Sequence, residues 1–404
     1  MNNKPLKKRE IIKIFKSIKI LKKKIQIIDI KNSIGRILAE DLLSTINVPP
    51  FNNSAVDGYA IKDSDLSLKK FRLIGRIVAG DNKNISLKSG EAVRIFTGAR
   101  MPKNSNTVVM QENSKEKDNF VSFLKLPKKN DNCRFFGEDI KKDLKILSKG
   151  DIIKTNNQSL IASIGLKKIK VYEKLKIGFF TSGNELRNPK RKISGSQIYN
   201  SNRYALFSLI KQSGFDVKDL GALQDNEKKV KLAISNAIKK FDILITTGGA
   251  SVGDEDYLID VIDKIGKIIF WKAAIKPGRP LAFGYIKKKP IICLPGNPVS
   301  VFLLFAMLIK SFLYKCNGSK WYEPIFQPAK INFNMKKKTN RMEWLRVKIN
   351  KDVSKEIILE KYPKQGSGII SSIAFSDGII EIPENVFRIK TGDIYKFYSK
   401  ESLF

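Results

Sequence analysis

Histidine is absent from this 404-residue chain. Without an imidazole, the chain cannot use a Ser-His-Asp or Cys-His catalytic unit, and no histidine can bind a metal ion. The three cysteines, Cys133, Cys293 and Cys316, are far apart and form no C-x-x-C pair. This spacing argues against a disulfide framework or a zinc site and is typical of a reducing cytoplasm. Any chemistry must therefore use carboxylates, lysine, arginine, hydroxyls, backbone dipoles or a bound cation.

Long apolar runs and a secretory signal are also lacking. We expect no apolar run to approach the length of a membrane span. The N-terminal sequence MNNKPLKKRE has neither an apolar core nor a small-residue cleavage site. We therefore expect a cytoplasmic protein without a membrane contact. The hydrophobic share of 42% permits buried cores, and the length suits about two to four domains.

Negative charge is scarce relative to positive charge. Lysine and arginine number 76 against 39 acids, which gives a net charge of +37. The lysines are spread along the whole chain, and we find no combined aromatic and basic motif of the kind that binds single-stranded nucleic acid. Compositional drift toward lysine, isoleucine and asparagine is therefore favoured over nucleic-acid binding. The field of such a chain would still attract a small anionic substrate.

Three patterns follow one another along the chain. Residues 1–173 begin with an amphipathic helix and continue with strand-like, glycine-punctuated sequence, which predicts an N-terminal region with an inserted mainly-β lobe at about 47–140. In residues 174–318, short strands alternate with helices, which predicts βαβ units and a parallel sheet. Residues 325–404 return to strands and turns, as in a small β-barrel or sandwich. The expected fold class is multidomain α/β plus β.

The most informative segment follows the predicted strand Ile243–Ile245, which ends in Thr-Thr-Gly-Gly. Gly248 and Gly249 leave backbone N–H groups accessible to an anion, and the acids at 254–256 could hold the cation that accompanies it. Open α/β sheets bind ligands at such strand ends. We interpret the segment as a phosphate and metal site, although a turn without function is the alternative for the two glycines alone.

A second loop is predicted at the same edge of the sheet. Thr181-Ser182-Gly183-Asn184-Glu185 follows the strand-like stretch 176–180. Two loops at adjacent strand ends define a crevice, which favours a binding function for this one.

The run F-W-K-A-A-I-K-P-G-R-P predicts a cluster of cations. Proline disfavours a helix before it, so alternation along an extended chain places Lys272 and Lys276 on one face. Pro277-Gly278 suits the centre of a type II turn, which directs Arg279 toward the same place. Three cations around one turn repel each other unless an anion lies between them. A solvated basic face is the alternative.

The segment I-I-C-L-P-G-N-P-V-S-V-F-L-L-F predicts a strand, a stiff turn and a buried helix. Asn297 suits the N-cap and Pro298 the first helical position. The free N–H groups of that helix start, together with Ser300, would receive a phosphate or an oxyanion.

The N-terminal region offers weaker candidates. Asp57 lies on a proline-containing loop, and Thr97 follows the predicted strand 92–95. Judged on the residues alone, both are better explained as ordinary turns. Arg134 and Asp139 could bind a phosphate and a metal or base, or form a surface ion pair, and the sequence does not decide between these.

Together these segments resemble the MoeA family of molybdopterin molybdenumtransferases, whose animal relatives include the C-terminal part of gephyrin. The resemblance runs from about residue 4 to residue 394 and rests on P-P-F-x-N-S-A-x-D-G-Y-A, F-T-G-A, R-x-x-G-E-D, G-G-x-S-V-G-x-x-D-Y, W-K-x-x-I-K-P-G-x-P and L-P-G-N-P-V-S. It implies a homodimer with an elongated, mainly-β N-terminal region, a molybdopterin-binding α/β domain and a C-terminal β-barrel. It also implies insertion of molybdate into adenylylated molybdopterin, with Mg²⁺-dependent release of AMP.

The resemblance also assigns roles to single residues. Asn52 and Asn184 depart from it, because many relatives have aspartate there. In the family the site forms between subunits, so Asp57 and Thr97 would serve a neighbour's crevice. The implied catalytic residues are Asp57, Thr97, Glu185, Asp256, Lys272 and Lys276, and the implied metal ligands are Asp57, Glu185, Asp225 and Asp256. The implied substrate-binding residues are Arg134, Asp139, Ser182, Gly183, Asp225, Gly248, Gly249, Ser251, Gly253, Arg279, Pro295, Asn297, Pro298, Ser300 and Ser367.

Three other functions stay open at this point. The nearest is adenylylation of molybdopterin, because that enzyme shares the α/β domain type. A non-catalytic cofactor-binding scaffold of the gephyrin kind and a nucleic-acid binder are the others. Expected partners are small anionic substrates, a second copy of the chain, a molybdopterin adenylyltransferase and enzymes that accept the cofactor.

Overall fold

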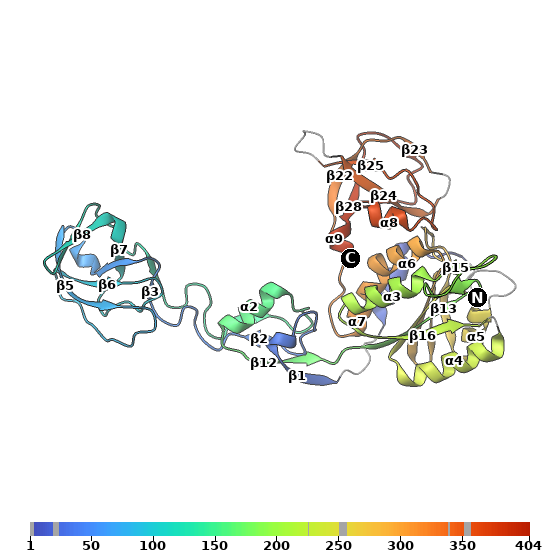
Figure 1. Ribbon diagram of the computed structural model, residues 1–404, viewed down its shortest axis with the longest axis horizontal. Coiled ribbons are helices and arrows are strands. Elements are labelled where there is room, and N and C mark those ends of the chain that lie inside the picture. Colours follow the sequence, from blue (N-terminus) through green and yellow to red (C-terminus); the bar gives the residue numbers. More distant parts are fainter. Residues whose placement is uncertain (1–3, 19–23, 225, 250–256, 338–339, 351–356) are drawn as a thin grey trace.

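The computed structural model describes residues 4–18, 24–224, 226–249, 257–337, 340–350 and 357–404. The chain is elongated (Figure 1). A mainly-β lobe forms one end, a narrow connecting segment follows, and an α/β domain lies beside a β-barrel at the other end. Residues in the lobe are therefore far from the α/β domain of the same chain.

The N-terminal lobe is built on a six-stranded sheet with the order β7-β4-β6-β5-β9-β8. Alternate residues along its strands enter two different cores: Ala60 and Val93 pack on one face, and Tyr59 and Ala92 on the other. This is the period-two pattern of a sheet buried on both faces. The strands are β4 (Gly58–Ile61), β5 (Lys70–Ile77), β6 (Glu91–Ile95), β7 (Thr107–Met110), β8 (Ser114–Lys117) and β9 (Phe120–Phe123), with β3 (Asn53–Ser54) paired to β10 (Cys133–Arg134) beside them.

The described part of the connecting segment contains two antiparallel strand pairs, a short 3-10 helix (Ile30–Asn32) and one α-helix. The chain passes through it twice, on the way to the lobe and on the way back. Its own small core includes Leu38, Ile161 and Val171, each buried. The pairs are β1 (Ile25–Asp29) with β12 (Lys168–Tyr172) and β2 (Leu42–Leu43) with β11 (Lys145–Leu147), and the helix is α2 (Thr155–Ser163).

The α/β domain contains the predicted parallel sheet. Its strand order is β16-β13-β17-β21-β20-β18, in which the first four strands are parallel and β20 pairs antiparallel with both β21 and β18. Helices α4 (Glu227–Lys240) and α5 (Tyr257–Ile265) cover one face, and α3 (Ser201–Gln212) covers the other. The strands are β13 (Lys176–Ser182), β16 (Asp216–Leu223), β17 (Ile243–Thr247), β18 (Lys267–Trp271), β20 (Ala282–Ile286) and β21 (Lys289–Leu294).

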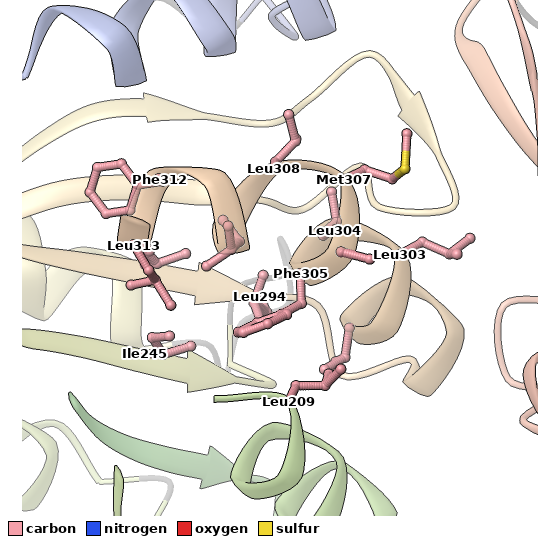
Figure 2. Packing of buried hydrophobic residues seen from close by; sticks show 14 of the residues in the cluster. Leu209, Ile245, Leu294, Leu303, Leu304, Phe305, Met307, Leu308, Phe312 and Leu313 are labelled. Carbon is pink, nitrogen blue, oxygen red and sulfur yellow. The ribbon is translucent and has the colours of Figure 1, made fainter. Parts of the chain in front are cut away.

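A nearly continuous helical stretch, residues 298–316, forms the centre of this domain. It comprises α6 (Pro298–Leu304), a π-helical turn (Phe305–Ile309) and α7 (Lys310–Cys316). By length and composition it could cross a membrane, contrary to the expectation that no apolar run approaches that length. However, 83% of its most apolar window is buried inside the protein. Its leucine and phenylalanine side chains pack against β17, β21 and α3, as expected of a core helix (Figure 2).

The predicted amphipathic helix at the N-terminus is α1 (Lys8–Ser17). Ile11 and Phe15 are fully buried, and the Phe15 ring lies 4.7 Å from that of Phe312 and 5.2 Å from that of Phe283, measured between centroids. The first helix of the chain therefore packs into the α/β domain, not into the distant lobe.

The C-terminal part is a closed β-barrel, which confirms one of the two predicted forms. Its strands form the ring β24-β25-β22-β28-β26, which closes because β26 also pairs with β24. A short strand of the α/β domain, β19 (Ile275–Lys276), pairs in parallel with β24 and places Lys276 opposite Glu343. The two domains thus share a sheet. The barrel strands are β22 (Gln327–Ile331), β24 (Met342–Asn350), β25 (Ile358–Lys361), β26 (Gly378–Ile382) and β28 (Ile394–Ser399).

Candidate active site

Three loops meet at the carboxyl ends of the neighbouring parallel strands β13, β17 and β21. The Gly248 N–H donates to the Leu294 carbonyl at 3.1 Å, and Thr247 Oγ1 donates to the Pro295 carbonyl at 2.8 Å. The backbone of Gly248 lies directly against the Ser182 carbonyl. The structure therefore brings the predicted loops together at one edge of the sheet, the place predicted for the crevice and the position where parallel α/β sheets bind ligands.

Gly248 permits this close approach because it has no side chain. Its φ is +84°, and a Cβ atom there would overlap the Ser182 carbonyl oxygen. We expect Gly248→Ala to lower the free energy of unfolding by about 3 kcal/mol, because backbone strain and a backbone clash add up. Denaturant unfolding measures this. Gly221→Ala is the matched control, since Gly221 has a φ of +91° and nothing within 4 Å of an added Cβ; it should cost only about 1 kcal/mol. Equal losses would contradict the close-packing explanation.

Asn202, which none of the sequence motifs includes, also holds these loops together. From the first turn of α3, its Nδ2 donates to Thr247 Oγ1 at 3.1 Å and to the Gly296 carbonyl at 2.6 Å. Its Oδ1 is buried without a hydrogen-bond partner among the described residues. An asparagine at a helix start is usually a cap, and here Asn200 has that role by accepting from the Arg203 N–H. No local pattern distinguishes the two asparagines.

The loop after β13 presents Glu185 beside Gly183. The φ of Gly183 is +142°, and the Glu185 carboxylate occupies the space that a Cβ of Gly183 would need. Glu185 is exposed to solvent. The loop can thus offer a carboxylate at the edge of the crevice.

A cavity of about 320 Å³ lies where the α/β domain meets the barrel. In the described part of the chain, four cationic side chains line it: Lys276 and Arg279 from the α/β domain, and Arg341 and Arg346 from the barrel. One acid, Glu343, lines it as well. The predicted residues that the cavity brings together are Lys276, Arg279, Pro295, Asn297, Ser300 and Ser367.

The start of α6 forms another part of the cavity wall. Asn297 occupies the N-cap position and Pro298 the first helical position, as predicted. Within the described residues, the Asn297 side chain makes no capping hydrogen bond, so it is available to the cavity. The Val299 N–H donates to the Ser367 carbonyl at 3.1 Å. The helix start is therefore tied to the loop that carries Ser367.

Arg346, which none of the sequence motifs includes, is the most deeply buried cation of this site. It is only 1% exposed. Its Nε donates to Ser372 Oγ at 3.1 Å, and its terminal nitrogens donate to the carbonyls of Trp344 and Gly366 at 3.2 and 3.3 Å. Burial lowers the pKa of Arg346 to about 10, so the guanidinium stays charged at neutral pH. A fixed positive charge thus forms the base of the cavity.

Lys272, the third predicted cation, does not line this cavity. Its φ is +86°, and its ammonium lies over the Trp271 ring, 4.4 Å from the centroid. Beyond Lys272 the predicted alternation of buried and exposed side chains is present, because Ala273 and Ile275 are fully buried while Lys276 is exposed.

Asp57 and Thr97 form a tight pair in the distant lobe. The Thr97 backbone N–H and its Oγ1 both donate to Asp57 Oδ1 at 2.8 Å. These two hydrogen bonds hold the pKa of Asp57 below its ordinary value. Arg134 lies in β10 opposite Asn53, and Asp139 follows after the turn. Among the described residues, Arg134 and Asp139 form no ion pair with each other.

The pKa of Asp57 should depend on the Thr97 hydroxyl. We expect Thr97→Val to raise that pKa toward its ordinary value, because one of the two donors is lost. A carboxylate whose pKa is lower in the folded than in the unfolded state stabilises the protein at pH values above its unfolded-state pKa, and this stabilisation is lost as the pH falls through its folded-state pKa. Thr97→Val should therefore be less stable than the wild-type protein at neutral pH, and the difference should be small below the folded-state pKa. A carboxyl-carbon NMR titration tests this. Thr97→Ser keeps the hydroxyl and is the control, and an unchanged pKa in Thr97→Val would contradict the assignment.

Four predicted residues, Asp225, Ser251, Gly253 and Asp256, lie outside the described residues. Among the residues that are described, no three His, Cys, Asp or Glu side chains gather in a manner that could hold a metal ion. Asp57 and Glu185 lie in different parts of the elongated chain (Figure 1).

The fold and the cavity define a multidomain protein in which an α/β domain and a β-barrel together enclose a cavity lined by lysine and arginine side chains. Residues 7–165 match the family described as MoeA N-terminal region (domain I and II), residues 178–315 match the probable molybdopterin binding domain, and residues 328–399 match the MoeA C-terminal region (domain IV). The chain belongs to the MoeA family.

Individual relatives agree with this assignment. The chain is 36% identical to a molybdopterin molybdenumtransferase of Haemophilus influenzae, over 91% of each chain. It is 30% identical to one of Staphylococcus epidermidis, over 98% of this chain and 97% of the relative. The crystal structure of a molybdopterin biosynthesis MoeA protein from Pyrococcus horikoshii superposes with a TM-score of 0.82 at 28% identity, over 98% of this chain and 100% of that one.

Proposed function

We propose that this chain is a molybdopterin molybdenumtransferase, which inserts molybdate into adenylylated molybdopterin and releases AMP. Membership of the MoeA family and the names of its relatives support a role in molybdenum cofactor biosynthesis. The observation that carries the proposal is the cavity lined by Lys276, Arg279, Arg341 and Arg346.

The charge of that cavity suits molybdate, a small tetrahedral dianion. Arginine and lysine form their strongest hydrogen bonds with oxyanions. Arg346 is held in place by three hydrogen bonds, so it needs no rearrangement when an anion arrives. The side chains of Asn297, Ser300 and Ser367 line the same space and can add neutral hydrogen bonds. We assign molybdate to this cavity.

The crevice formed by the loops after β13, β17 and β21 suits the phosphates of the second substrate. Gly248 and Gly249 have positive φ angles, and because they have no side chains their backbone N–H groups are accessible to a phosphate. The cavity and the crevice share the loop Pro295–Asn297, which would place molybdate near the pterin. The sulfurs of the pterin bind molybdenum themselves, so the protein supplies position and charge.

Asp57 and Thr97 require a second copy of the chain in this proposal. They lie in the lobe, far from the α/β domain of their own chain (Figure 1). We propose that a homodimer brings the lobe of one protomer to the crevice of the other. Arg134 and Asp139 would reach the substrate in the same way.

Carboxylate oxygens are the protein ligands that Mg²⁺ prefers, and the ionised Asp57 and the exposed Glu185 fit that chemistry. We propose that they hold Mg²⁺ with Asp225 and Asp256. When bound, the ion would neutralise charge on the pyrophosphate. The Thr97 donors keep Asp57 deprotonated and oriented for that role. We also propose that the protein works in the cytoplasm, receives its substrate from a molybdopterin adenylyltransferase and passes the cofactor to enzymes that accept it.

Release of AMP from adenylylated molybdopterin by the purified protein with Mg²⁺, with and without molybdate, tests the function. The proposal predicts release only when molybdate is present. An adenylyltransferase would instead consume ATP in the presence of molybdopterin without molybdate. A scaffold would bind the pterin without releasing AMP, and a nucleic-acid binder would show salt-dependent DNA binding without AMP release. Each of these three results would replace the proposed function.

A further inference from the structure

The cationic cavity contains one buried acid. Glu343 is only 2% exposed, although four positive side chains line the same space in the described part of the chain. Burying a carboxylate is costly unless it is paired. An acid in a pocket for an anion also opposes the binding of that anion. Its presence therefore needs a reason other than substrate binding.

Glu343 contacts Lys276 symmetrically. The Lys276 ammonium lies 3.3 Å from Oε1 and 3.3 Å from Oε2 of Glu343. The two residues are also backbone partners, because β19 pairs with β24 at this point. The Lys276 side chain is 48% exposed, whereas the Glu343 side chain is 3% exposed. The acid is thus the fixed member of the pair, and the lysine is the member that can move.

The charges around the cavity explain why the pair forms there. Positive side chains this close together repel each other by an amount on the order of 1 kcal/mol per pair or more at the effective dielectric of a protein surface. A carboxylate beside Lys276 offsets part of that repulsion while no anion is bound. A dianion in the cavity would take over this role and compete with Glu343 for the ammonium.

We propose that Glu343 is a positioning residue for the oxyanion site: it holds the Lys276 ammonium at the cavity and lowers the affinity for the oxyanion. This inference rests on the proposed assignment of an oxyanion to the cavity. The carboxylate weakens oxyanion binding, but it also orients the Lys276 ammonium before the oxyanion arrives.

The test compares Glu343→Gln with the wild-type protein. The amide keeps the shape of the side chain and one oxygen acceptor but removes the negative charge. We expect molybdate alone, titrated by calorimetry in low salt, to bind about tenfold more tightly to the variant, with a difference that shrinks as salt is added. With adenylylated molybdopterin, the KM for molybdate and kcat should both fall, because Lys276 is no longer held in place. Glu343→Asp should recover part of the wild-type kcat.

Glu381→Gln is the matched control. Glu381 forms an ion pair with Lys8 and accepts from Trp344 Nε1 at 3.1 Å, so it too joins the barrel to the rest of the protein. It should leave molybdate affinity unchanged. Equal or weaker molybdate binding by Glu343→Gln would overturn the proposal, as would a wild-type protein that binds no molybdate. If the wild-type protein binds molybdate but releases no AMP, the proposed function fails, and the affinity of the variant still decides the role of Glu343.

Discussion

A mixture of Asp57→Ala and Lys276→Ala proteins should show activity that neither variant has alone. Each change removes a charged group of the site, so each pure variant should lose at least about a thousandfold in turnover. In a mixed dimer, one of the two sites combines the intact Asp57 of one protomer with the intact Lys276 of the other. After equal amounts are dissociated and reassociated at random, about a quarter of the wild-type activity should return.

The mixing experiment tests the shared site directly. Recovery of activity is expected because the lobe is far from the α/β domain within a single chain (Figure 1). A mixture of Lys276→Ala and Arg346→Leu is the control, because both residues line one cavity of one chain. In a mixed dimer of these two variants every site keeps one defect, so no activity should return. Recovery in the control, or none in the first mixture, would contradict a site completed by the second protomer.

Replacement of Arg346 by leucine should strongly weaken molybdate binding. The guanidinium is the only buried positive charge that lines the cavity among the described residues. Loss of a charge-assisted contact to a dianion should weaken binding by about a hundredfold. The oxygens of Ser372, Trp344 and Gly366 would also lose their donor, which should destabilise the protein by about 2 kcal/mol after the relief of charge burial is subtracted.

Two comparisons separate binding from stability in this prediction. Arg346→Lys keeps the charge but not the planar geometry, so it should retain part of the molybdate affinity. Arg388→Leu removes an exposed arginine of the same C-terminal domain and should change stability by less than about 0.5 kcal/mol without affecting molybdate binding. Calorimetric titration and denaturant unfolding provide both readouts. Normal molybdate affinity in Arg346→Leu would remove this residue from the site.

Much of the α/β domain could be predicted because its signals are local. The strands β13, β17 and β21 and the helix α3 follow from short apolar runs, periodicity and glycine stops. The Gly248 loop was recognisable because two glycines follow a buried strand. The helical stretch 298–316 was predicted as a helix, but its membrane-like length and hydropathy were underestimated.

The barrel side of the cavity could not be predicted from the sequence alone. In β24, residues 342–347 are all buried, because one face packs into the barrel and the other against the α/β domain. Glu343 and Arg346 in an isolated strand would be expected to face solvent. The burial of Glu343 beside Lys276 follows from the pairing of β19 with β24, which joins segments about 70 residues apart. Arg346 is buried against Gly366 and Ser372, which come from a later segment of the chain. The sequence motifs identified Lys276 and Ser367 but not Glu343 and Arg346, which line the same cavity.

The ratio of molybdenum to AMP tests the central claim most directly. The purified protein is incubated with adenylylated molybdopterin, Mg²⁺ and molybdate, and the molybdenum bound to the pterin and the AMP released are measured in the same sample. The proposed function predicts that both appear together, one molybdenum for each AMP, and that neither appears in Asp57→Ala. AMP release without molybdenum in the pterin would contradict it, because the chain would then be a hydrolase of the adenylylated pterin and not an enzyme that inserts the metal.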